Sequence, residues 1–469
     1  MKTHPLSIGT LHIIGIGGIG MSSLAEVLHR SGHSVQGSDR ADNKNIERLR
    51  HLGVPVFIGT DPKNVEGATT VVRSSDVPLN NPEVVAARKK GIAVLSRAEL
   101  LSEIMRYTSA IAISGTHGKT TTTSLMATMM IEAGLDPTVL SGGILVDLLS
   151  NARAGAGNWM VVEADESDQT FIQIPATIAV ITNIEPEHLN NYGSFAKLKE
   201  AFIKFANDVP FYGFSVVCLD HPVVKEILPK ITKPHITYGT HKKADCRATN
   251  IKHTSTGMSF DVHFDNYDIK DVQLALHGRH NVLNALAVIV VAIKMGVFPS
   301  IIKHTLASFS GVQRRFTTVA EVEGVTIVDD YGHHPTEIAA VLTAAQKLTK
   351  HKVIAVVQPH RYSRLHDLFK EFATCFSNAD TVILAPVYAA GEKPIPNATH
   401  TALAAEVHKH FKGKVYTINA EEELAPLLKT IVHKGDYVIL LGAGSISQWA
   451  HNLPKSLEPL LKHSWKKIS

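Results

Sequence analysis

Short apolar runs alternate along the chain with longer amphipathic stretches, and glycine turns often separate the two. In the first hundred residues, the apolar runs that predict strands are 11–14, 34–37, 54–58, 70–74 and 93–95. The stretches between them that predict helices are 21–31, 45–52 and 82–90. Strands that alternate with helices are typical of a parallel sheet covered by helices. We therefore expect a Rossmann-like α/β domain over residues 1–107.

The middle of the chain changes its pattern. The apolar runs that again predict buried strands are 110–113, 159–162 and 177–182. A helix is expected over 120–133. Between residues 212 and 276, strand patterns alternate with short turns, which predicts a mixed extension of the same sheet. We expect one central domain over residues 108–312.

The last part of the chain returns to the alternating pattern. Its predicted strands are 325–328, 352–357, 381–384, 415–417 and 437–441, with helices between them. This pattern predicts a second Rossmann-like sheet over residues 313–469. The chain as a whole is thus predicted to be an α/β protein of three domains.

Composition excludes several classes of protein. The chain has 469 residues, of which 44% are hydrophobic and 19% are charged, as in folded soluble proteins. Its 47 basic and 43 acidic residues give a formal net charge of +4, which is too balanced to indicate a nucleic-acid or membrane partner. The three cysteines are far apart and form no metal motif, which favours a reducing compartment. Without a signal-peptide pattern or an apolar stretch that could span a bilayer, we expect a cytoplasmic protein.

The first predicted strand runs into a glycine turn. The turn is Gly-Ile-Gly-Gly-Ile-Gly at 15–20, a helix follows it, and Ser38 and Asp39 end the next strand. A helix N-terminus attracts phosphates and an acid can bind a ribose hydroxyl, so the layout favours a nucleotide diphosphate. The pattern does not show which base the nucleotide carries, so NAD and FAD are both possible ligands. A tight turn that binds no ligand is a further alternative. Ser74 also follows a strand and is either a ligand contact or a helix cap.

A second glycine turn follows the strand at 110–113. The sequence Ser-Gly-Thr-His-Gly-Lys-Thr at 114–120 offers backbone N–H groups, a lysine and a hydroxyl at the start of a helix. These groups suit phosphates and Mg²⁺. The general phosphate-loop pattern would place its first glycine at Ile113, whereas this chain has Gly115, so the match is incomplete. A glycine turn without a ligand is the alternative.

Polar side chains follow the next strands. Four acids lie within 163–168 and form either a solvated turn or an Mg²⁺ site opposite the phosphates. His188 lies just past a strand end, where it can reach a metal or a phosphate unless its role is structural. Asn281 and Asn284 share one face at a helix start and are either caps or donors to a nucleotide base.

The last domain carries its own candidates. Arg314 and Arg315 are adjacent cations at the domain junction and are candidates for a phosphate contact. His333, His334 and His360 raise a zinc hypothesis, but neither a cysteine nor a His-x-x-x-His spacing supports it.

Eight stretches together resemble the Mur ligase family. They are GIGGIGMSSLAE, GTHGKTTT, EADESD, NIEPEHL, GRHNVLNA, RRF, DDYGHHPTE and QPHRYSR, and they cover nearly the whole chain. The resemblance implies an ATP-dependent ligase of peptidoglycan synthesis, with ATP and Mg²⁺ as cofactors. QPHRYSR resembles the branch that joins L-alanine to the carboxylate of UDP-N-acetylmuramate through an acyl phosphate, releasing ADP and phosphate. These small molecules are the expected partners, and the protein is expected to be a monomer or a homodimer.

The resemblance also implies roles for individual residues. The ATP site would comprise Gly115, Thr116, His117, Gly118, Lys119, Thr120, Thr121, Asn281 and Asp330. Metal ligands would be Thr120 and Glu163 for one ion and His188 for a second. The UDP part would lie on Gly15, Gly17, Gly18, Ser38, Asp39 and Ser74. L-Alanine would bind near Tyr331, His360 and Arg361. The catalytic residues would be Lys119, Glu163, His188 and Arg315, with Arg314 as the alternative phosphate contact.

Two positions depart from the family pattern. Phe202 stands where several members carry a modified lysine, and Asn190 stands where an aspartate often follows the histidine. Closure of the domains about residues 310–313 would shield the acyl phosphate from water. Three alternatives stay open: a ligase that recycles a murein tripeptide onto the same nucleotide sugar, an NAD-dependent oxidoreductase, and a nucleotide-switch module without chemistry.

Overall fold

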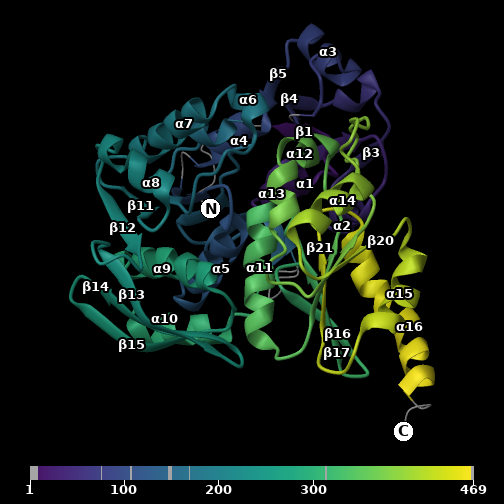
Figure 1. Cartoon of the computed structure of the whole chain (residues 1–469). Coiled ribbons are helices and arrows are strands. Elements are labelled where there is room, and N and C mark those ends of the chain that lie inside the picture. The colour runs from purple at the N-terminus through teal and green to yellow at the C-terminus, as the bar shows by residue number, and fades with distance from the viewer. Residues whose placement is uncertain are drawn as a thin grey trace. The chain divides into compact units, whose positions relative to one another are not determined.

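Figure 1 shows the computed structural model, which describes residues 9–74, 76–105, 108–145, 150–167, 169–311 and 314–465. It is an α/β protein with three sheets, which confirms the expected fold class. The chain divides into two compact units. Unit 1 holds Met1–Lys252 and Met258–Val312, and unit 2 holds His253–Gly257 and Gln313–Ser469. The proposed hinge at 310–313 includes two residues, 312 and 313, that lie outside the described residues, as does Asp168 of the acidic segment.

The first sheet of unit 1 has five parallel strands in the order β3-β2-β1-β4-β5. They are β1 (Thr10–Ile14), β2 (Ser34–Asp39), β3 (Val56–Ile58), β4 (Ala68–Arg73) and β5 (Ala93–Ser96). The helices are α1 (Ile19–Arg30), α2 (Lys44–His51), α3 (Pro82–Lys89) and α4 (Arg97–Met105). Leu11 and Ile13 share a buried cluster with α1, whereas Ile14 packs with α3. Both faces of the sheet are therefore covered, as a parallel sheet requires.

The central sheet of unit 1 has ten strands in the order β15-β14-β13-β12-β11-β10-β6-β9-β7-β8. They are β6 (Ser109–Ser114), β7 (Thr138–Leu145), β8 (Ser150–Arg153), β9 (Trp159–Glu163), β10 (Ile178–Ile181), β11 (Phe214–Cys218), β12 (His235–Gly239), β13 (Cys246–Thr254), β14 (Gly257–Phe264) and β15 (Tyr267–Leu274). The helices are α5 (Lys119–Glu132), α6 (Leu189–Tyr192), α7 (Phe195–Asn207), α8 (Pro222–Ile227), α9 (Arg279–Lys294) and α10 (Pro299–Ser308). Strands β14 and β15 pair antiparallel, so the sheet is mixed, as the sequence predicts.

The register of three central strands positions the candidate chemistry. Strand β6 lies between β10 and β9, and all three run parallel. Ile113 pairs with Glu163, and Ser114 pairs with Ile181. The glycine turn, the acidic segment and the segment after β10 therefore leave neighbouring strands at one edge of the sheet. Ligands of open α/β sheets bind at this kind of edge.

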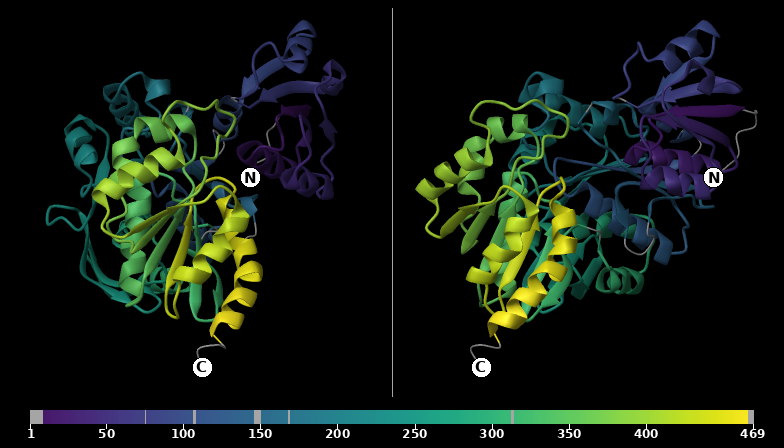
Figure 2. Two further views of the ribbon diagram at one scale, coloured as in Figure 1. Left: turned by 45° about the vertical axis from the view of Figure 1, so that its right-hand side comes forward. Right: turned by 90° about the vertical axis from the view of Figure 1, so that its right-hand side faces the viewer.

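The sheet of unit 2 has six strands in the order β16-β17-β21-β18-β19-β20. They are β16 (Thr317–Val322), β17 (Val325–Asp330), β18 (Val353–Val357), β19 (Thr381–Leu384), β20 (Lys414–Thr417) and β21 (Tyr437–Leu441). The helices are α11 (Pro335–Leu348), α12 (Tyr362–Asp367), α13 (Phe369–Thr374), α14 (His400–His410), α15 (Leu424–Ile431) and α16 (Ile446–Trp465). Ala355 and Val357 pack in the cluster that holds residues of α11 to α14, whereas Ile354 and Val356 pack in the cluster of α15 and α16. Both views in Figure 2 show α16 beside this sheet.

Several elements were not expected from the apolar runs. Helix α4, the strands β7, β8 and β13, and the antiparallel edge strand β16 are additions to the predicted pattern. The boundaries proposed for the three domains stay a prediction. Within the described ranges, no helix is long and apolar enough to cross a membrane.

Candidate active site

The glycine turn after β6 has a conformation that needs its glycines. Gly115 has a φ of +136°, and a Cβ there would lie 2.0 Å from Oγ1 of Thr182. Gly118 has a φ of +81° and is the N-cap of α5. Both positions disfavour other residue types, because a side chain is strained at positive φ. The turn therefore brings the backbone close to the segment after β10.

That segment holds the turn in place. Asn183 accepts the backbone N–H of His117 through Oδ1 (2.7 Å), and its Nδ2 donates to the carbonyl of His117 (2.9 Å). Thr182 Oγ1 also donates to this carbonyl (2.6 Å), and Asn183 O accepts the N–H of Thr116 (3.1 Å). Because neighbouring residues fix the loop on both sides, its shape is set before any ligand arrives.

Lys119 folds back over the loop that precedes it. Its Nζ donates to the carbonyls of Gly115 (2.7 Å) and Thr116 (3.2 Å) and forms an ion pair with Oε2 of Glu166 (2.7 Å). The Glu166 side chain is only 1% exposed. Within the described residues its other oxygen, Oε1, is buried without a hydrogen-bond partner. The lysine thus already has an anionic partner at the point where a phosphate would bind.

Burial and like charges set the protonation of this pair. Burial raises the pKa of Glu166 to about 7, and Asp165 adds to the rise, while Lys119 opposes it. Burial alone would lower the pKa of Lys119, but the charges of Glu166, Asp165 and Glu163 outweigh it and raise the pKa. Burial also favours the neutral form of Asp165, yet Lys119 and hydrogen bonds from Ser167 hold the pKa of Asp165 below its usual range. Lys119 is therefore a cation at neutral pH.

A hydroxyl and a carboxylate meet at the start of α5. Thr120 Oγ1 donates to Oε1 of Glu163 (3.1 Å), and Gly142 N donates to Oε2 of the same carboxylate (2.7 Å). Hard divalent cations prefer oxygen ligands of these two kinds. The donor set therefore fits Mg²⁺, and the structure brings together Thr120 and Glu163 as the sequence predicts.

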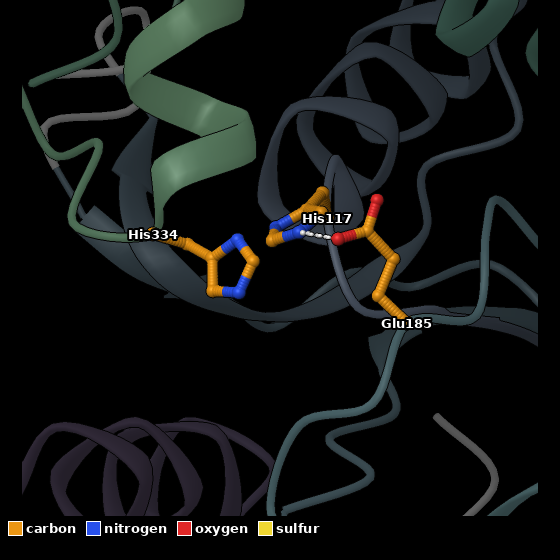
Figure 3. A group of neighbouring side chains, drawn as sticks. All are labelled: His117, Glu185 and His334. Carbon is orange, nitrogen blue, oxygen red and sulfur yellow. Dashed lines mark hydrogen bonds and ion pairs between the residues drawn. The ribbon is translucent and has the colours of Figure 1, made fainter. Parts of the chain in front are cut away.

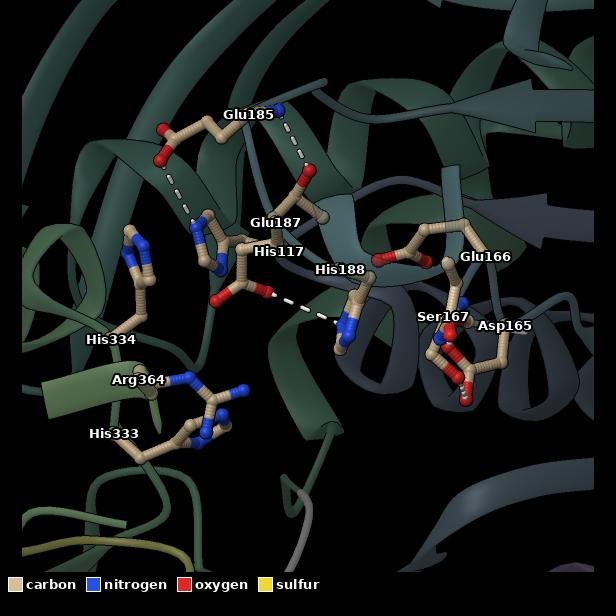
Figure 4. A network of polar contacts seen from close by, with 12 residues as sticks. His117, Asp165, Glu166, Ser167, Glu185, Glu187, His188, His333, His334 and Arg364 are labelled. Carbon is tan, nitrogen blue, oxygen red and sulfur yellow. Dashed lines mark hydrogen bonds and ion pairs between the residues drawn. The ribbon is translucent and has the colours of Figure 1, made fainter. Parts of the chain in front are cut away.

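A second group of possible ligands lies beside Glu166 (Figure 4). Ligand atoms of Glu166, Glu187 and His188 lie within 4.8 Å of one another. His188 Nε2 is 3.6 Å from Oε2 of Glu187. Carboxylate oxygens and an imidazole nitrogen can bind a divalent cation, so the predicted role of His188 fits this surrounding. No role for Glu187 is predicted from the sequence, although it follows a strand end just as His188 does. The Asn190 side chain is outside the described residues.

His117 of the glycine turn contacts a third acid. Its Nε2 lies 3.4 Å from Oε2 of Glu185, as the dashed line in Figure 3 marks. The backbone N–H of Glu185 donates to Oγ1 of Thr116 (2.8 Å). His334, also drawn in Figure 3, belongs to unit 2, where its Nδ1 accepts the N–H of Thr336 at the start of α11.

The two asparagines of α9 differ in their surroundings. Asn284 is buried, and its Oδ1 lies 2.7 Å from the position that a Cβ on Gly118 would take. Asn281 is partly exposed, accepts from Nδ2 of Asn284 (3.1 Å) and donates to the carbonyl of His277 (2.8 Å). Asn284 therefore lies against the glycine turn, and Asn281 is the more exposed of the two amides.

The first sheet brings its predicted residues together. Gly15 N donates to the carbonyl of Ser38 (2.8 Å), and Gly17 N donates to Oδ2 of Asp39 (2.8 Å). A Cβ on Gly15 would lie 3.3 Å from Cβ of Ser74. Gly18 is the N-cap of α1. The glycine turn, the end of β2 and the segment after β4 therefore meet at one place.

A buried network behind this turn was missed by the sequence analysis. Glu83 Oε2 pairs with Nε2 of His12 (3.0 Å) and accepts from Oγ of Ser38 (2.5 Å), while Oε1 accepts from Nδ2 of Asn64 (2.8 Å). Burial favours the neutral carboxyl, but His12 and the hydrogen bonds from Ser38 and Asn64 hold the pKa of Glu83 below its usual range. The Ser38 hydroxyl is thus already bonded, and Ser38 contributes to the turn through its carbonyl. The four residues are spread from 12 to 83, so spacing gave no signal.

The candidate residues of unit 2 line one group of rings. Tyr331 lies edge-on to His333 (5.2 Å between centroids), and His333 lies 5.8 Å from His360. His360 stacks on Tyr388 at 5.4 Å. Burial, with the charges of His333, Arg364 and Arg361, lowers the pKa of His360 to about 4, so it is neutral at pH 7.

Cations surround this group. The guanidinium carbons of Arg314 and Arg315 lie 4.8 and 5.2 Å from the ring centroid of Tyr331. Arg314 also donates to the carbonyl of Gly442 (2.8 Å). Arg361 follows β18 with a φ of +72°, and its side chain is 53% exposed. Its Nη1 lies 3.9 Å from Oε1 of Glu392, and its exposure leaves the guanidinium accessible to a further carboxylate.

Asp330 ends β17 and is bonded to the backbone. It accepts from the N–H groups of Phe316 (2.7 Å) and Gly332 (2.6 Å). Burial raises the pKa of Asp330 to about 6, against the charge of Arg315 and the two N–H groups. In this structure, Asp330 shapes the turn that carries Tyr331.

Together the fold and the site define an α/β protein with a glycine loop at the N-terminus of α5 and an adjoining pair of oxygen donors whose chemistry fits a divalent cation. Three family models match the chain: "Mur ligase family, catalytic domain" at residues 10–108, "Mur ligase middle domain" at 113–292 and "Mur ligase, glutamate ligase domain" at 314–444. The chain belongs to the Mur ligase family, as its motifs predict.

Individual relatives match over nearly the full length. A protein of Rhodospirillum rubrum named UDP-N-acetylmuramate–L-alanine ligase is 52% identical over 465 residues, which cover 98% of this chain and 97% of the relative. One of the same name from Agrobacterium fabrum is 51% identical over 463 residues, or 97% and 98% of the two chains. The crystal structure of UDP-N-acetylmuramate-alanine ligase from Thermotoga maritima matches with a TM-score of 0.79 and 26% identity, covering 98% of this chain and 100% of that one.

Proposed function

We propose that this protein joins L-alanine to the carboxylate of UDP-N-acetylmuramate in peptidoglycan synthesis and converts ATP to ADP and phosphate. The names of relatives about 50% identical over nearly their whole length support this activity. The observation that carries the proposal is the phosphate loop, in which Lys119 lies beside the Thr120–Glu163 pair. An oxidoreductase has no use for that arrangement.

The reaction has two steps. The sugar carboxylate attacks the γ-phosphorus of ATP, which forms an acyl phosphate and expels ADP. The amine of L-alanine then attacks the acyl carbon, loses a proton and displaces phosphate, so that an amide remains. Two anions have to meet in the first step, and their repulsion is the main barrier that binding groups can lower.

The loop residues supply the positive charge for that step. Lys119 donates to the β- and γ-phosphate oxygens after leaving Glu166, and the N–H groups of the turn from Gly115 to Thr121 bind the phosphates. Thr120 and Glu163 would hold Mg²⁺, with His188 at a second ion, and Mg²⁺ supplies neutralisation of phosphate charge when bound. Asn281 and Asp330 are proposed to contact the nucleoside, and Arg315 a phosphate.

The two other substrates have their own surfaces. We propose that the UDP part binds at Gly15, Gly17 and Gly18 at the start of α1, next to Asp39 and Ser74. In unit 2, Arg361 is proposed to bind the carboxylate of L-alanine, since a guanidinium binds carboxylates through two parallel hydrogen bonds. His360 is neutral at pH 7 and can accept a hydrogen bond from the alanine ammonium, and Tyr331 closes the side of the site.

Phosphate release tests the substrate assignment. Purified protein is mixed with UDP-N-acetylmuramate, ATP and Mg²⁺, and each amino acid is added in turn. We expect release with L-alanine well above that with the other amino acids. Release only with the tripeptide L-alanyl-γ-D-glutamyl-meso-diaminopimelate would favour the recycling ligase and overturn the proposal. Absence of release with every acceptor would also overturn it.

We further propose a cytoplasmic location and a monomer or homodimer in solution. Light scattering on the eluate of a size-exclusion column gives the molar mass and tests the second point. A mass of four or more chains would contradict it.

A further inference from the structure

The last glycine of the first turn, which takes the place of the third glycine in the G-x-G-x-x-G pattern, faces a side chain. Gly20 lies in the first turn of α1, and a Cβ there would lie 2.9 Å from Nη1 of Arg97 and 3.6 Å from its Cδ and Cζ. These are the three nearest heavy atoms. In dinucleotide-binding folds the third glycine of the turn serves close packing of the helix against a strand. Here the glycine makes room for a guanidinium.

Arg97 is a cation that has no polar partner among the residues that the structure describes. It is the first residue of α4 and is partly buried. Among the residues that the structure describes, none forms a hydrogen bond or an ion pair with its guanidinium. Arg73, by contrast, donates to the carbonyl of Val77 (2.9 Å), and Arg30 pairs with Glu26 (2.9 Å). A partly buried charge without a partner is unfavourable unless a ligand supplies one.

The N-terminus of α1, which lies beside Arg97, has neither a side-chain cap nor an acidic residue in its first turn. Gly18 is the N-cap of α1 and provides no side chain that accepts the first N–H groups of the helix, and the first turn of α1 contains no acidic residue. A helix N-terminus in this state attracts an anion. The nearby carboxylate of Asp39 is bonded to Gly17 N, one residue before the cap. The positive end of α1 and the Arg97 guanidinium thus lie next to each other.

We propose that Arg97 binds the diphosphate of the nucleotide-sugar substrate, and that position 20 is glycine because a side chain would push the guanidinium off the start of α1. A planar guanidinium donates two parallel hydrogen bonds to a phosphate, which a helix N-terminus alone does not do. The inference rests on the proposed function, because it assigns a partner to the diphosphate of that same substrate. Sequence alone gave no hint, since residues 20 and 97 are far apart in the chain.

Calorimetric titration of the full chain with UDP and with uridine tests this assignment. Arg97→Gln should weaken UDP binding about ten- to a hundredfold, the usual worth of a hydrogen bond to a charged group, and leave uridine binding unchanged. Arg97→Lys keeps the positive charge but cannot donate two parallel hydrogen bonds, so it should bind UDP more tightly than Arg97→Gln and more weakly than the wild type. Arg88→Gln, at an exposed position on α3, is the matched control and should bind UDP as the wild type does.

A double-mutant cycle tests the role of the glycine. Gly20→Ala should weaken UDP binding in the wild type but add little in the Arg97→Gln background, where the displaced group is absent. An equal effect in both backgrounds would mean that Gly20 serves packing of the helix alone and would overturn that part. ATP binding and the thermal unfolding midpoint report on folding in every variant. If Arg97→Gln does not fold, Arg97→Lys and Gly20→Ala carry the test, because both should still lower the UDP affinity.

The outcomes separate this inference from the proposed function. If the wild type binds UDP and Arg97→Gln binds it equally well, the assignment of Arg97 is wrong and the proposed function stands. If the wild type itself does not bind UDP, both are wrong. A loss of uridine and UDP binding in equal proportion would also overturn the assignment, since the arginine would then act on the nucleoside or on the fold.

Discussion

At the residue scale, Lys119 is the most constrained functional side chain. Its ammonium group contacts two carbonyls of the loop and one buried carboxylate, and we expect it to leave that carboxylate when a phosphate binds. Lys119 was predictable from the sequence, because Gly-Lys-Thr at a strand–helix junction places a positive charge where phosphates bind. Glu166 was not predictable as the partner, because four acids in one short segment are equivalent until the backbone is known.

Lys119→Ala is expected to lower turnover at least about a hundredfold, as the loss of one charged donor to a transferred group does. UDP-sugar binding should change little, because the residues proposed to bind UDP lie at the first sheet and Lys119 lies at the central sheet. Phosphate release and calorimetry measure the two effects. Lys199→Ala, which removes an exposed ion pair with Glu226, is the control. Parallel loss of turnover and sugar binding would contradict this layout.

Gly115→Ala tests how closely the loop is packed. The new Cβ would lie 2.0 Å from Oγ1 of Thr182, which itself holds the carbonyl of His117. We expect a loss of about 2–4 kcal/mol in the free energy of unfolding and at least tenfold weaker ATP binding. The close contact of the new Cβ and the backbone strain at positive φ both destabilise the loop.

Gly134→Ala is the matched comparison for that variant. Gly134 also has a positive φ of +73°, but no heavy atom lies within 4 Å of the Cβ position. Backbone strain alone should cost about 1 kcal/mol and leave ATP binding unchanged. Urea unfolding and calorimetry measure both variants. Equal effects of the two substitutions would show that conformation, and not contact with Thr182, controls the loop.

At the scale of elements, the buried carboxylate of Glu83 joins α3 to β1, β2 and the segment before β4. Removing it in Glu83→Ala leaves His12, Ser38 and Asn64 without their common acceptor. We expect a loss of about 3 kcal/mol in the free energy of unfolding, as for other buried pairs that lose one partner. Urea unfolding at pH 7 measures it. A loss under about 1 kcal/mol would mean that water replaces the carboxylate.

The same carboxylate gives a pH dependence with a definite sign. Its pKa is lowered in the folded protein, so its contribution to stability is present above the unfolded-state value near 4.5. That contribution is lost as the pH falls below about 4.5 toward the lower folded-state value. The gap in unfolding free energy between wild type and Glu83→Ala should therefore narrow when the pH falls from 6 to 3.5. A gap that widens on acidification would contradict the lowered pKa.

Element prediction succeeded where local patterns are strong. Strands β1, β9 and β19 are clear apolar runs, and their positions were predicted within a residue. The hairpin of β7 and β8 was missed because Thr138–Leu145 contains two glycines and two hydroxyl residues, which weaken a strand pattern. Helix α4 was missed although Leu100, Leu101 and Ile104 have helical spacing, and Arg97 was missed with it.

The candidate site also has parts that local sequence predicts and parts that it does not. Loop residues that follow strands were predictable, because strand ends of a parallel sheet meet at one edge. Contacts across long sequence distances were not. His12 and Glu83 are 71 positions apart, and neither lies in a motif. Such pairs depend on which face of a strand meets which helix, and that is settled only when the layers pack.

At the scale of the whole molecule, the hydrophobic cores follow the two units. Both buried clusters of unit 2 contain only residues between Phe316 and Leu461. The first sheet, by contrast, shares its cluster with the central sheet, since Leu101 and Ile104 of α4 belong to the cluster that contains Phe171.

These cores predict how fragments behave. The fragment 313–469 should fold alone and unfold in one cooperative thermal transition, because its clusters are complete. The fragment 1–107 should melt at a lower temperature or fail to fold, because α4 loses the neighbours around Phe171. Circular dichroism during heating measures both. A cooperative, more stable fragment 1–107 would contradict this division of the cores.

The ion pair between Lys119 and Glu166 makes the phosphate loop selective by amount of charge. A small anion that reaches the loop competes with a carboxylate that is already in contact and already desolvated. Sulfate or free phosphate brings at most one more negative charge than the carboxylate that it must displace, whereas a triphosphate brings several more charges and many acceptors at once. We therefore expect small anions to bind this loop weakly. We expect the same competition to favour the departure of the single phosphate product after turnover, when Lys119 pairs with Glu166 again.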